Sequence, residues 1–233
     1  MNDYENIVPS NLDSYLDNYE SVFGYPHRPL DLDTKKYDKN IAFFGCSLTY
    51  GLGVSNQDTY PSKVQQLSDN KWNCLNFGVQ GGSLDLIGVI YNKVIKEIDI
   101  DCVVVQWPSL YRRMYFNDGE YVGYHVNISN EISKHFAKVS DEYYCVVRNL
   151  SNLQILNSFK NTFNLSRIVG QELRELFEFY NIHNILEFPF KGSIAGILDE
   201  VDDKYKLKND LHPNEKWYEK YSKYLYKELV NVV

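Results

Sequence analysis

One stretch decides the fold class: Ile41-Ala42-Phe43-Phe44-Gly45-Cys46-Ser47-Leu48-Thr49-Tyr50-Gly51-Leu52-Gly53. Its four apolar residues, closed by Gly45, predict a buried parallel strand that ends in a tight turn. Such strand ends are where open α/β sheets bind their ligands. Gly51 and Gly53 let the backbone bend sharply and approach a neighbour closely. Ser47 and Thr49 carry the hydroxyls suited to chemistry in this turn, and Ser47 is the candidate nucleophile.

Predicted strands and helices alternate along the next part of the chain. Thr59 and Pro61 are typical of a helix start, and Ser83 is typical of a helix cap. An order of strand, helix and strand implies a parallel sheet with right-handed crossovers. The predicted elements after the first strand are a helix to about residue 69, a strand over 72–77, a helix over 83–98, a strand over 102–106, a long helical region over about 151–180, a strand over 183–188 and a helix from Pro213 onward.

This pattern predicts an α/β protein, a three-layer α/β/α sandwich with a central parallel sheet of about five strands. Residues 1–38 are rich in Asp, Asn, Tyr and Pro, and Tyr25-Pro26-His27-Arg28-Pro29 marks an extended, non-helical path. We expect residues 1–38 to form an arm packed on a domain that spans 39–233. The pattern breaks down over about 107–148, where one hairpin is expected over 120–128. This irregular insertion leaves the end of the third predicted strand and is well placed to form a wall of a site.

Composition and charge exclude several classes of function. A net charge of -7 and a pI of about 5.3 argue against a nucleic-acid-binding surface. The chain lacks a signal-peptide pattern and any run near the ~20 apolar residues of a membrane span, so we expect a cytoplasmic chain that does not bind membranes. Its four cysteines lack zinc-site spacing, so reduced thiols and no metal are expected. The glycines match neither a phosphate loop nor a dinucleotide fingerprint, and no cofactor is expected.

Two short blocks resemble a known family. Gly45-Cys46-Ser47-Leu48-Thr49 resembles the first block of the SGNH, or GDSL, hydrolases, with Cys46 where the family usually has Asp. Asn209-Asp210-Leu211-His212-Pro213-Asn214 resembles the final block, in which an Asp shortly precedes a His-Pro pair. The resemblance covers about 40–106 and 205–230. It implies an SGNH fold and a cofactor-free serine esterase, from a family whose members cleave small acyl esters on sugars, lipids and thioesters.

Acyl transfer through serine needs a base, a group that orients the base, and donors for the oxyanion. The resemblance implies Ser47 as nucleophile and His212 as the base. Asp210 is the candidate orienting group, because Asn209, at the family's usual Asp position, brings no charge to stabilise imidazolium. Cys46 is the rival nucleophile, since a thiolate is intrinsically stronger.

The oxyanion donors are expected to be the backbone N–H groups of Ser47 and Gly81, with Gly78 as the competing choice. The family's third block, Gly-x-Asn-Asp, is absent, so the Asn donor is missing. Ser109 or Arg112 can substitute for it. Trp107, Ser109 and Arg112 are the expected substrate-binding residues in the insertion, although a surface ion pair is the alternative role for Arg112.

The sequence therefore favours a serine esterase that hydrolyses small acyl esters, with O-acetyl groups on a carbohydrate as the expected substrate class. The departures from the family's blocks leave two alternatives open. One is a carbohydrate-binding or assembly protein on the same fold with weakened catalysis. The other is an O-acyltransferase that uses the same residues and passes the acyl group to a sugar hydroxyl.

Overall fold

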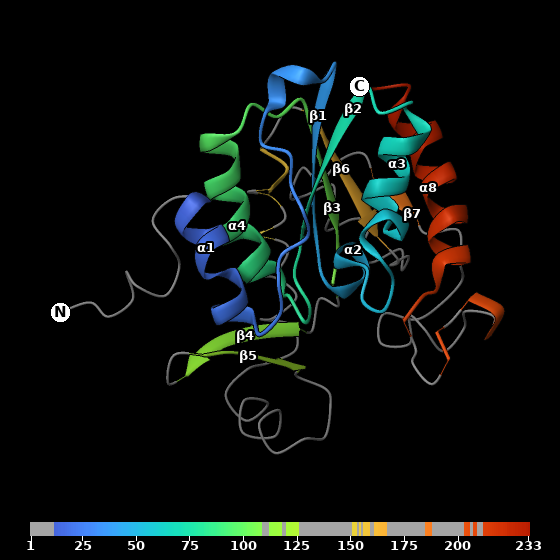
Figure 1. Ribbon diagram of the computed structural model, residues 1–233. Coiled ribbons are helices and arrows are strands. Elements are labelled where there is room, and N and C mark those ends of the chain that lie inside the picture. The colour runs from blue at the N-terminus through green and yellow to red at the C-terminus, as the bar shows by residue number, and fades with distance from the viewer. Residues whose placement is uncertain are drawn as a thin grey trace.

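A five-stranded parallel sheet forms the centre of the molecule, in the order β2-β1-β3-β6-β7 (Figure 1). The computed structural model describes residues 12–108, 112–117, 120–125, 151–152, 154, 156–158, 161–166, 185–187, 203–205, 207–208 and 212–233. The strands are β1 (Lys39–Gly45), β2 (Trp72–Gly78), β3 (Cys102–Gln106), β6 (Thr162–Ser166) and β7 (Ile185–Glu187). The expected α/β class and sheet of about five strands are confirmed.

Helices cover both faces of this sheet (Figure 1). The α-helices are α1 (Leu12–Phe23), α2 (Ser47–Tyr50), α3 (Tyr60–Leu67), α4 (Leu84–Glu97) and α8 (Glu215–Leu229), and the 3-10 helices are η2 (Thr34–Lys36), η3 (Asn56–Asp58) and η4 (Asp203–Tyr205). Helices α1 and α4 lie on one face, and α3 and α8 lie on the other. The arrangement is the three-layer sandwich that the sequence predicts.

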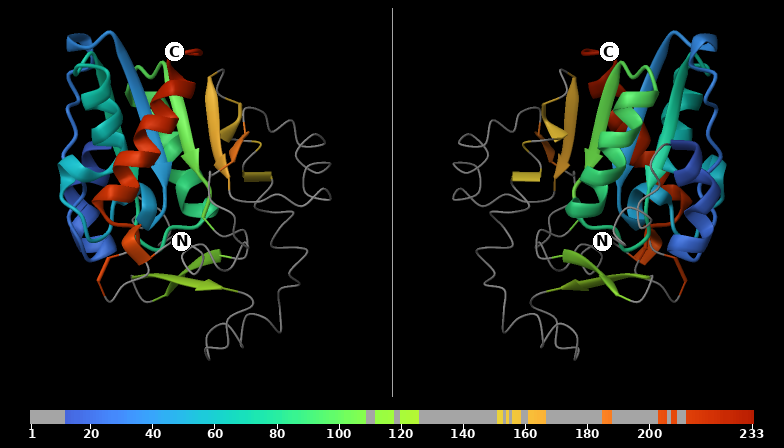
Figure 2. Two further views of the ribbon diagram at one scale, coloured as in Figure 1. Left: turned by 90° about the vertical axis from the view of Figure 1, so that its right-hand side faces the viewer. Right: turned by 90° about the vertical axis from the view of Figure 1, so that its left-hand side faces the viewer.

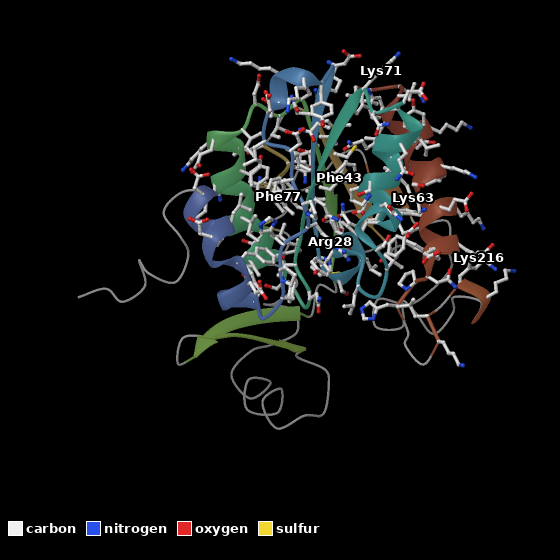
Figure 3. All side chains as sticks on the ribbon, viewed as in Figure 1. Arg28, Phe43, Lys63, Lys71, Phe77 and Lys216 are labelled. Atoms are coloured by element: carbon white, nitrogen blue, oxygen red, sulfur yellow. The ribbon has the colours of Figure 1, made fainter. Side chains whose placement is uncertain are left out.

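Each face of the sheet buries its own hydrophobic core, because successive strand residues point to opposite sides. Phe77 packs on the side of α1 and α4, whereas Phe43 packs on the side of α3 and α8 (Figure 3). Both side chains are at most 2% exposed. The first three strands are buried along almost their whole length, which is why β1 and β3 appear in the sequence as continuous apolar runs rather than alternating ones.

Local capping signals place two helix starts where the sequence predicts them. Thr59 caps α3, accepting from the Ser62 N–H at 3.4 Å, and Ser83 caps α4. The last helix differs: Asn214 is its cap and accepts from the N–H groups of Lys216 and Trp217, so α8 begins at Glu215 and not at Pro213.

The N-terminal arm contains a helix that the predictions above lack. Residues 12–23 form α1, because Leu16, Tyr19 and Phe23 recur at helical spacing and pack on the α4 side of the core, whereas residues 25–29 are non-helical, as expected. Two further sequence predictions are wrong. Strand β6 interrupts the region predicted as one long helix, because these residues pair in parallel with β3. The hairpin joins β4 (Arg112–Asn117) to β5 (Glu120–His125), and it therefore starts at Arg112, earlier than expected.

All five parallel strands end at the same edge of the sheet. Helix α2 follows the end of β1 there, and the hairpin of β4 and β5 lies across this edge and contacts α4 and α1 (Figures 1 and 2). Within the described part of the chain, no helix combines the length and the apolar character needed to span a membrane. The hairpin thus borders the edge at which α/β sheets bind ligands.

Candidate active site

Ser47 is the first residue of α2, directly after the turn that ends β1. It is the one residue of 41–50 that is not buried. Thr49, the other hydroxyl considered for chemistry, is fully buried, and its Oγ1 lies 2.8 Å from the Tyr60 hydroxyl. The turn therefore presents a single accessible hydroxyl, that of Ser47, at the carboxyl edge of the sheet.

Helix α2 is a single turn, which is too short to be stable on its own. Side chains from distant elements hold it by binding the carbonyls that face out of the turn. These pairs are Tyr218 Oη to Leu48 O at 3.1 Å, Asn76 Nδ2 to Thr49 O at 2.8 Å, Arg28 Nε to Tyr50 O at 2.7 Å and Arg28 Nη2 to Gly51 O at 2.6 Å. The backbone that carries Ser47 is thus held by tertiary contacts in addition to its own helical bonds, such as the bond from the Gly51 N–H to Ser47 O at 2.9 Å.

The glycines after β2 have different roles. A Cβ on Gly78 would lie 2.2 Å from the Tyr50 backbone nitrogen, so only glycine lets β2 approach α2 this closely. The Gly78 N–H donates to Asn76 Oδ1 at 2.9 Å and is therefore occupied. Gly81 has a φ of 67°, lies exposed, and its N–H donates to no acceptor in the described residues. The Ser47 N–H likewise donates to no acceptor in the described residues. These observations favour the N–H groups of Ser47 and Gly81 over that of Gly78 as oxyanion donors.

Gln106 is a site residue that the sequence reasoning did not assign. Its fully buried side chain lies behind the turn, where Oε1 accepts from the Cys46 N–H at 3.4 Å, from Cys46 Sγ at 3.2 Å and from Thr49 Oγ1 at 3.4 Å. A polar residue that closes the apolar run of β3 was the available signal. The Cys46 thiol is 4% exposed and bonded to this amide, so it supports the turn from inside while Ser47 faces outward.

His212 meets Ser47 across 165 residues of sequence, with its Nε2 3.0 Å from Ser47 Oγ. The segment that carries it is held by a hydrogen bond from the Leu207 N–H to His212 O at 2.9 Å. Leu207 in turn packs on Gly53, where an added Cβ would lie 2.1 Å from Leu207 Cδ1. The glycine near the serine turn therefore makes room for the segment that brings the imidazole to the hydroxyl.

The remaining predicted site residues fall in different places. Trp107 is 3% exposed and packs in the core on the α4 side, so its side chain offers little surface to a substrate. Arg112 begins β4, beside the carboxyl edge of the sheet. Ser109, Asn209 and Asp210 lie outside the described residues.

Three cysteines lie in the described residues, and all three are free and buried: Cys46, Cys74 and Cys102. Burial raises the pKa of Cys74 well above its usual value and that of Cys102 to about 12, so both remain protonated thiols. Across the described ranges, no group of three or more His, Cys, Asp or Glu residues is arranged to hold a metal ion.

No protein-family model matches the chain, and no curated protein is similar to it in sequence. Solved structures with the same fold do exist. The esterase EstA from Pseudoalteromonas sp., in a structure inhibited by monoethylphosphonate, gives a TM-score of 0.53 at 12% identity and covers 83% of this chain and 100% of that chain. A member of the lipolytic G-D-S-L family from Veillonella parvula gives 0.51 at 15% identity, with 83% and 99% covered.

A third solved structure is a two-domain esterase, CEX, active on acetylated mannans. Its TM-score is 0.51 at 13% identity, with 85% of this chain and 51% of that chain covered. This chain therefore spans about half the length of the two-domain esterase. Together, these similarities show that the chain has an SGNH-hydrolase-like fold, as the two sequence blocks predict.

Proposed function

We propose that this chain is a serine esterase in which Ser47 is the nucleophile and His212 is the general base and acid. The observation that carries the proposal is the 3.0 Å distance between Ser47 Oγ and His212 Nε2. A nucleophile and a base within hydrogen-bond reach, over the carboxyl edge of a parallel sheet, are the arrangement that acyl transfer needs. Asp210 is the proposed group that orients the imidazole.

The reaction proceeds in two halves. Ser47 Oγ attacks the acyl carbonyl carbon while His212 Nε2 takes the hydroxyl proton, and the resulting oxyanion accepts from the N–H groups of Ser47 and Gly81. The tetrahedral intermediate collapses to an acyl-serine, and the imidazolium returns the proton to the departing alcohol oxygen. Water then attacks the acyl-serine with His212 as base, which releases the acid and restores the Ser47 hydroxyl.

The proposed substrates are small acyl esters, with O-acetyl groups on a carbohydrate as the first class to test. The similarity in fold to an esterase active on acetylated mannans supports this choice. The hairpin across the carboxyl edge also supports it, because its sequence is rich in Arg and Tyr, residues suited to polar rings. We place Arg112, at the start of β4, and Ser109 among the substrate contacts.

The test combines p-nitrophenyl acetate turnover with labelling by a fluorophosphonate. We expect Ser47→Ala to lose the label and to lower kcat/KM by about 10³-fold or more. Two matched controls should keep both: Ser55→Ala, which removes a hydroxyl bonded at 2.6 Å to Asp58, and Cys46→Ser, which preserves the bond to Gln106. An unlabelled wild type whose turnover is unchanged by Ser47→Ala would identify a binding protein instead.

A sugar acceptor separates hydrolysis from transfer. Both reactions pass through the same acyl-serine, so the label and the Ser47→Ala result are common to them. We expect added mannose oligomers to leave the yield of free acetate unchanged. A rise in acetylated sugar at the expense of free acetate would identify an acyltransferase.

A further inference from the structure

The segment Tyr25-Pro26-His27-Arg28-Pro29 precedes the sheet and contains none of the proposed catalytic residues, yet Arg28 reaches the turn that carries Ser47 (Figure 3). Its guanidinium donates through Nε to Tyr50 O at 2.7 Å and through Nη2 to Gly51 O at 2.6 Å and Val54 O at 3.1 Å. The same group stacks over the Tyr50 ring, with Cζ 4.2 Å from the ring centroid. Arg28 thus closes the C-terminal end of α2.

Three carbonyls converge there because the chain reverses direction. Gly51 adopts a φ of 79° and ends α2, so the carbonyls of Tyr50 and Gly51 lie beyond the reach of the helix's own N–H groups. A planar, permanently charged guanidinium can donate to several acceptors in one plane and stack on an aromatic ring at once. A lysine at this position would supply a point charge without that geometry.

Tyr25 of this segment and Tyr19 of α1 also contact the turn after β2, which carries Gly81. The Tyr25 hydroxyl is hydrogen-bonded to the Gln80 N–H, one residue before Gly81, and the Tyr19 hydroxyl donates to Gly78 O at 2.9 Å. The rings of Tyr25 and Tyr50 pack edge to face at 4.8 Å. Residues 19–28 therefore hold both backbone turns whose N–H groups are the proposed oxyanion donors.

We propose that Arg28 is a positioning residue of the active site, which fixes the Ser47 turn through the carbonyls of Tyr50, Gly51 and Val54. On this proposal the N-terminal segment positions the backbone of the active site and does more than pack against the domain. The proposal rests on the proposed esterase function for its kinetic consequence, but its structural consequence is independent of that function.

The kinetic test compares Arg28→Ala with the loss of another cation of residues 1–38, Lys36 in η2. We expect Arg28→Ala to lower kcat by about 10–100-fold at nearly unchanged KM, because a small displacement of the nucleophile slows chemistry more than binding. Arg28→Lys should fall close to Arg28→Ala. Lys36→Ala, which removes an exposed side chain paired with Asp33 at 3.2 Å, should behave as the wild type. Ethylguanidinium, but not ethylammonium, should restore turnover to Arg28→Ala.

Amide hydrogen exchange supplies a readout that does not depend on activity. In Arg28→Ala we expect faster exchange over residues 46–54 than in the wild type, with exchange across α8 unchanged as the internal reference. Equally faster amide exchange over residues 46–54 and over α8 would mean a general loss of stability and would overturn the proposal. An Arg28→Ala variant whose kcat per fluorophosphonate-titrated site equals that of the wild type would also overturn it. If the wild type has no esterase activity, the proposed function fails, and the exchange result alone decides whether Arg28 positions the turn.

Discussion

The two segments that meet at the candidate site are held in different ways. Residues 46–54, the serine turn, have their carbonyls bound by side chains from the N-terminal segment, from β2 and from α8. The histidine segment is anchored, among its described contacts, by backbone hydrogen bonds that join Leu207 to His212 and Tyr205 to Asn214, and by Leu207 packed on Gly53. The turn that carries Ser47 is thus anchored in the interior of the fold, whereas His212 lies on a segment that packs against that turn.

This difference predicts which substitutions should lower stability and which should lower activity. Loss of a single buried donor to the serine turn, such as the Tyr218 hydroxyl, leaves one carbonyl unsatisfied and costs more stability than activity, because the other carbonyl bonds remain. A change under the histidine segment shifts the imidazole relative to Ser47, which costs activity at a smaller loss of stability. The predictions that follow probe the two sides in turn.

Removing the base should have the largest effect. We expect His212→Ala to lower kcat/KM for p-nitrophenyl acetate by about 10³-fold or more while the free energy of unfolding changes little, because the ring is only half-buried. Lys208→Ala, an exposed change in the same segment, is the control and should keep full turnover. A His212→Ala enzyme with more than a tenth of wild-type turnover would exclude the imidazole as the base.

Crowding the contact under the histidine segment should have the next largest effect. In Gly53→Ala the new Cβ meets Leu207 Cδ1, so we expect kcat to fall by about 10-fold as the segment shifts. The double variant with Leu207→Ala should recover much of that loss, because it removes the clash. Gly24→Ala has a similar positive φ with open space around it, and it controls for backbone strain alone. A Gly53→Ala loss that Leu207→Ala does not relieve would assign the effect to strain.

On the serine side, we expect Tyr218→Phe to lower the free energy of unfolding by about 1–3 kcal/mol, because Leu48 O loses its donor in a fully buried site. Turnover should fall less than in Gly53→Ala, since the other carbonyl bonds remain. Tyr226→Phe is the matched control, because that hydroxyl makes no hydrogen bond to the described residues. Urea unfolding at pH 7 measures both, and equal stabilities for the two variants would refute the role of this bond.

The smallest effect is expected beside the turn, at Asp58. A hydrogen bond from the Ser55 hydroxyl and the Lys63 ammonium at 2.9 Å hold the pKa of this carboxyl below its usual value. A depressed native pKa adds stability above the unfolded pKa of about 3.9, and that stability is lost as the pH falls through the native pKa. We expect Asp58→Asn to be less stable than the wild type by about 0.5–1 kcal/mol at pH 7, with the gap closing below about pH 4. A gap in urea unfolding that is as large at pH 3 as at pH 7 would contradict this.

Long-range packing explains the sequence predictions that were wrong. The residues of β6 were assigned to a helix, and they form a strand because the free edge of β3 accepts them in parallel register. Arg28 had no local signal of function, and the signal for Gln106 was only its polar side chain at the end of the apolar run of β3, because each residue acts on a turn that lies distant in sequence. Helix α1 carries helical spacing in its apolar residues, and its polar composition concealed that pattern.

The amino-acid sequence by itself determined the first three strands, the capped starts of α3 and α4, and the accessible hydroxyl after β1, because apolar runs, caps and glycines act within a few residues. Only the tertiary structure decided that Nε2 of His212 lies 3.0 Å from Ser47 Oγ and that Arg28 binds the end of α2. Such contacts depend on how separate segments pack on one sheet, and no local preference of the backbone specifies the distance between them.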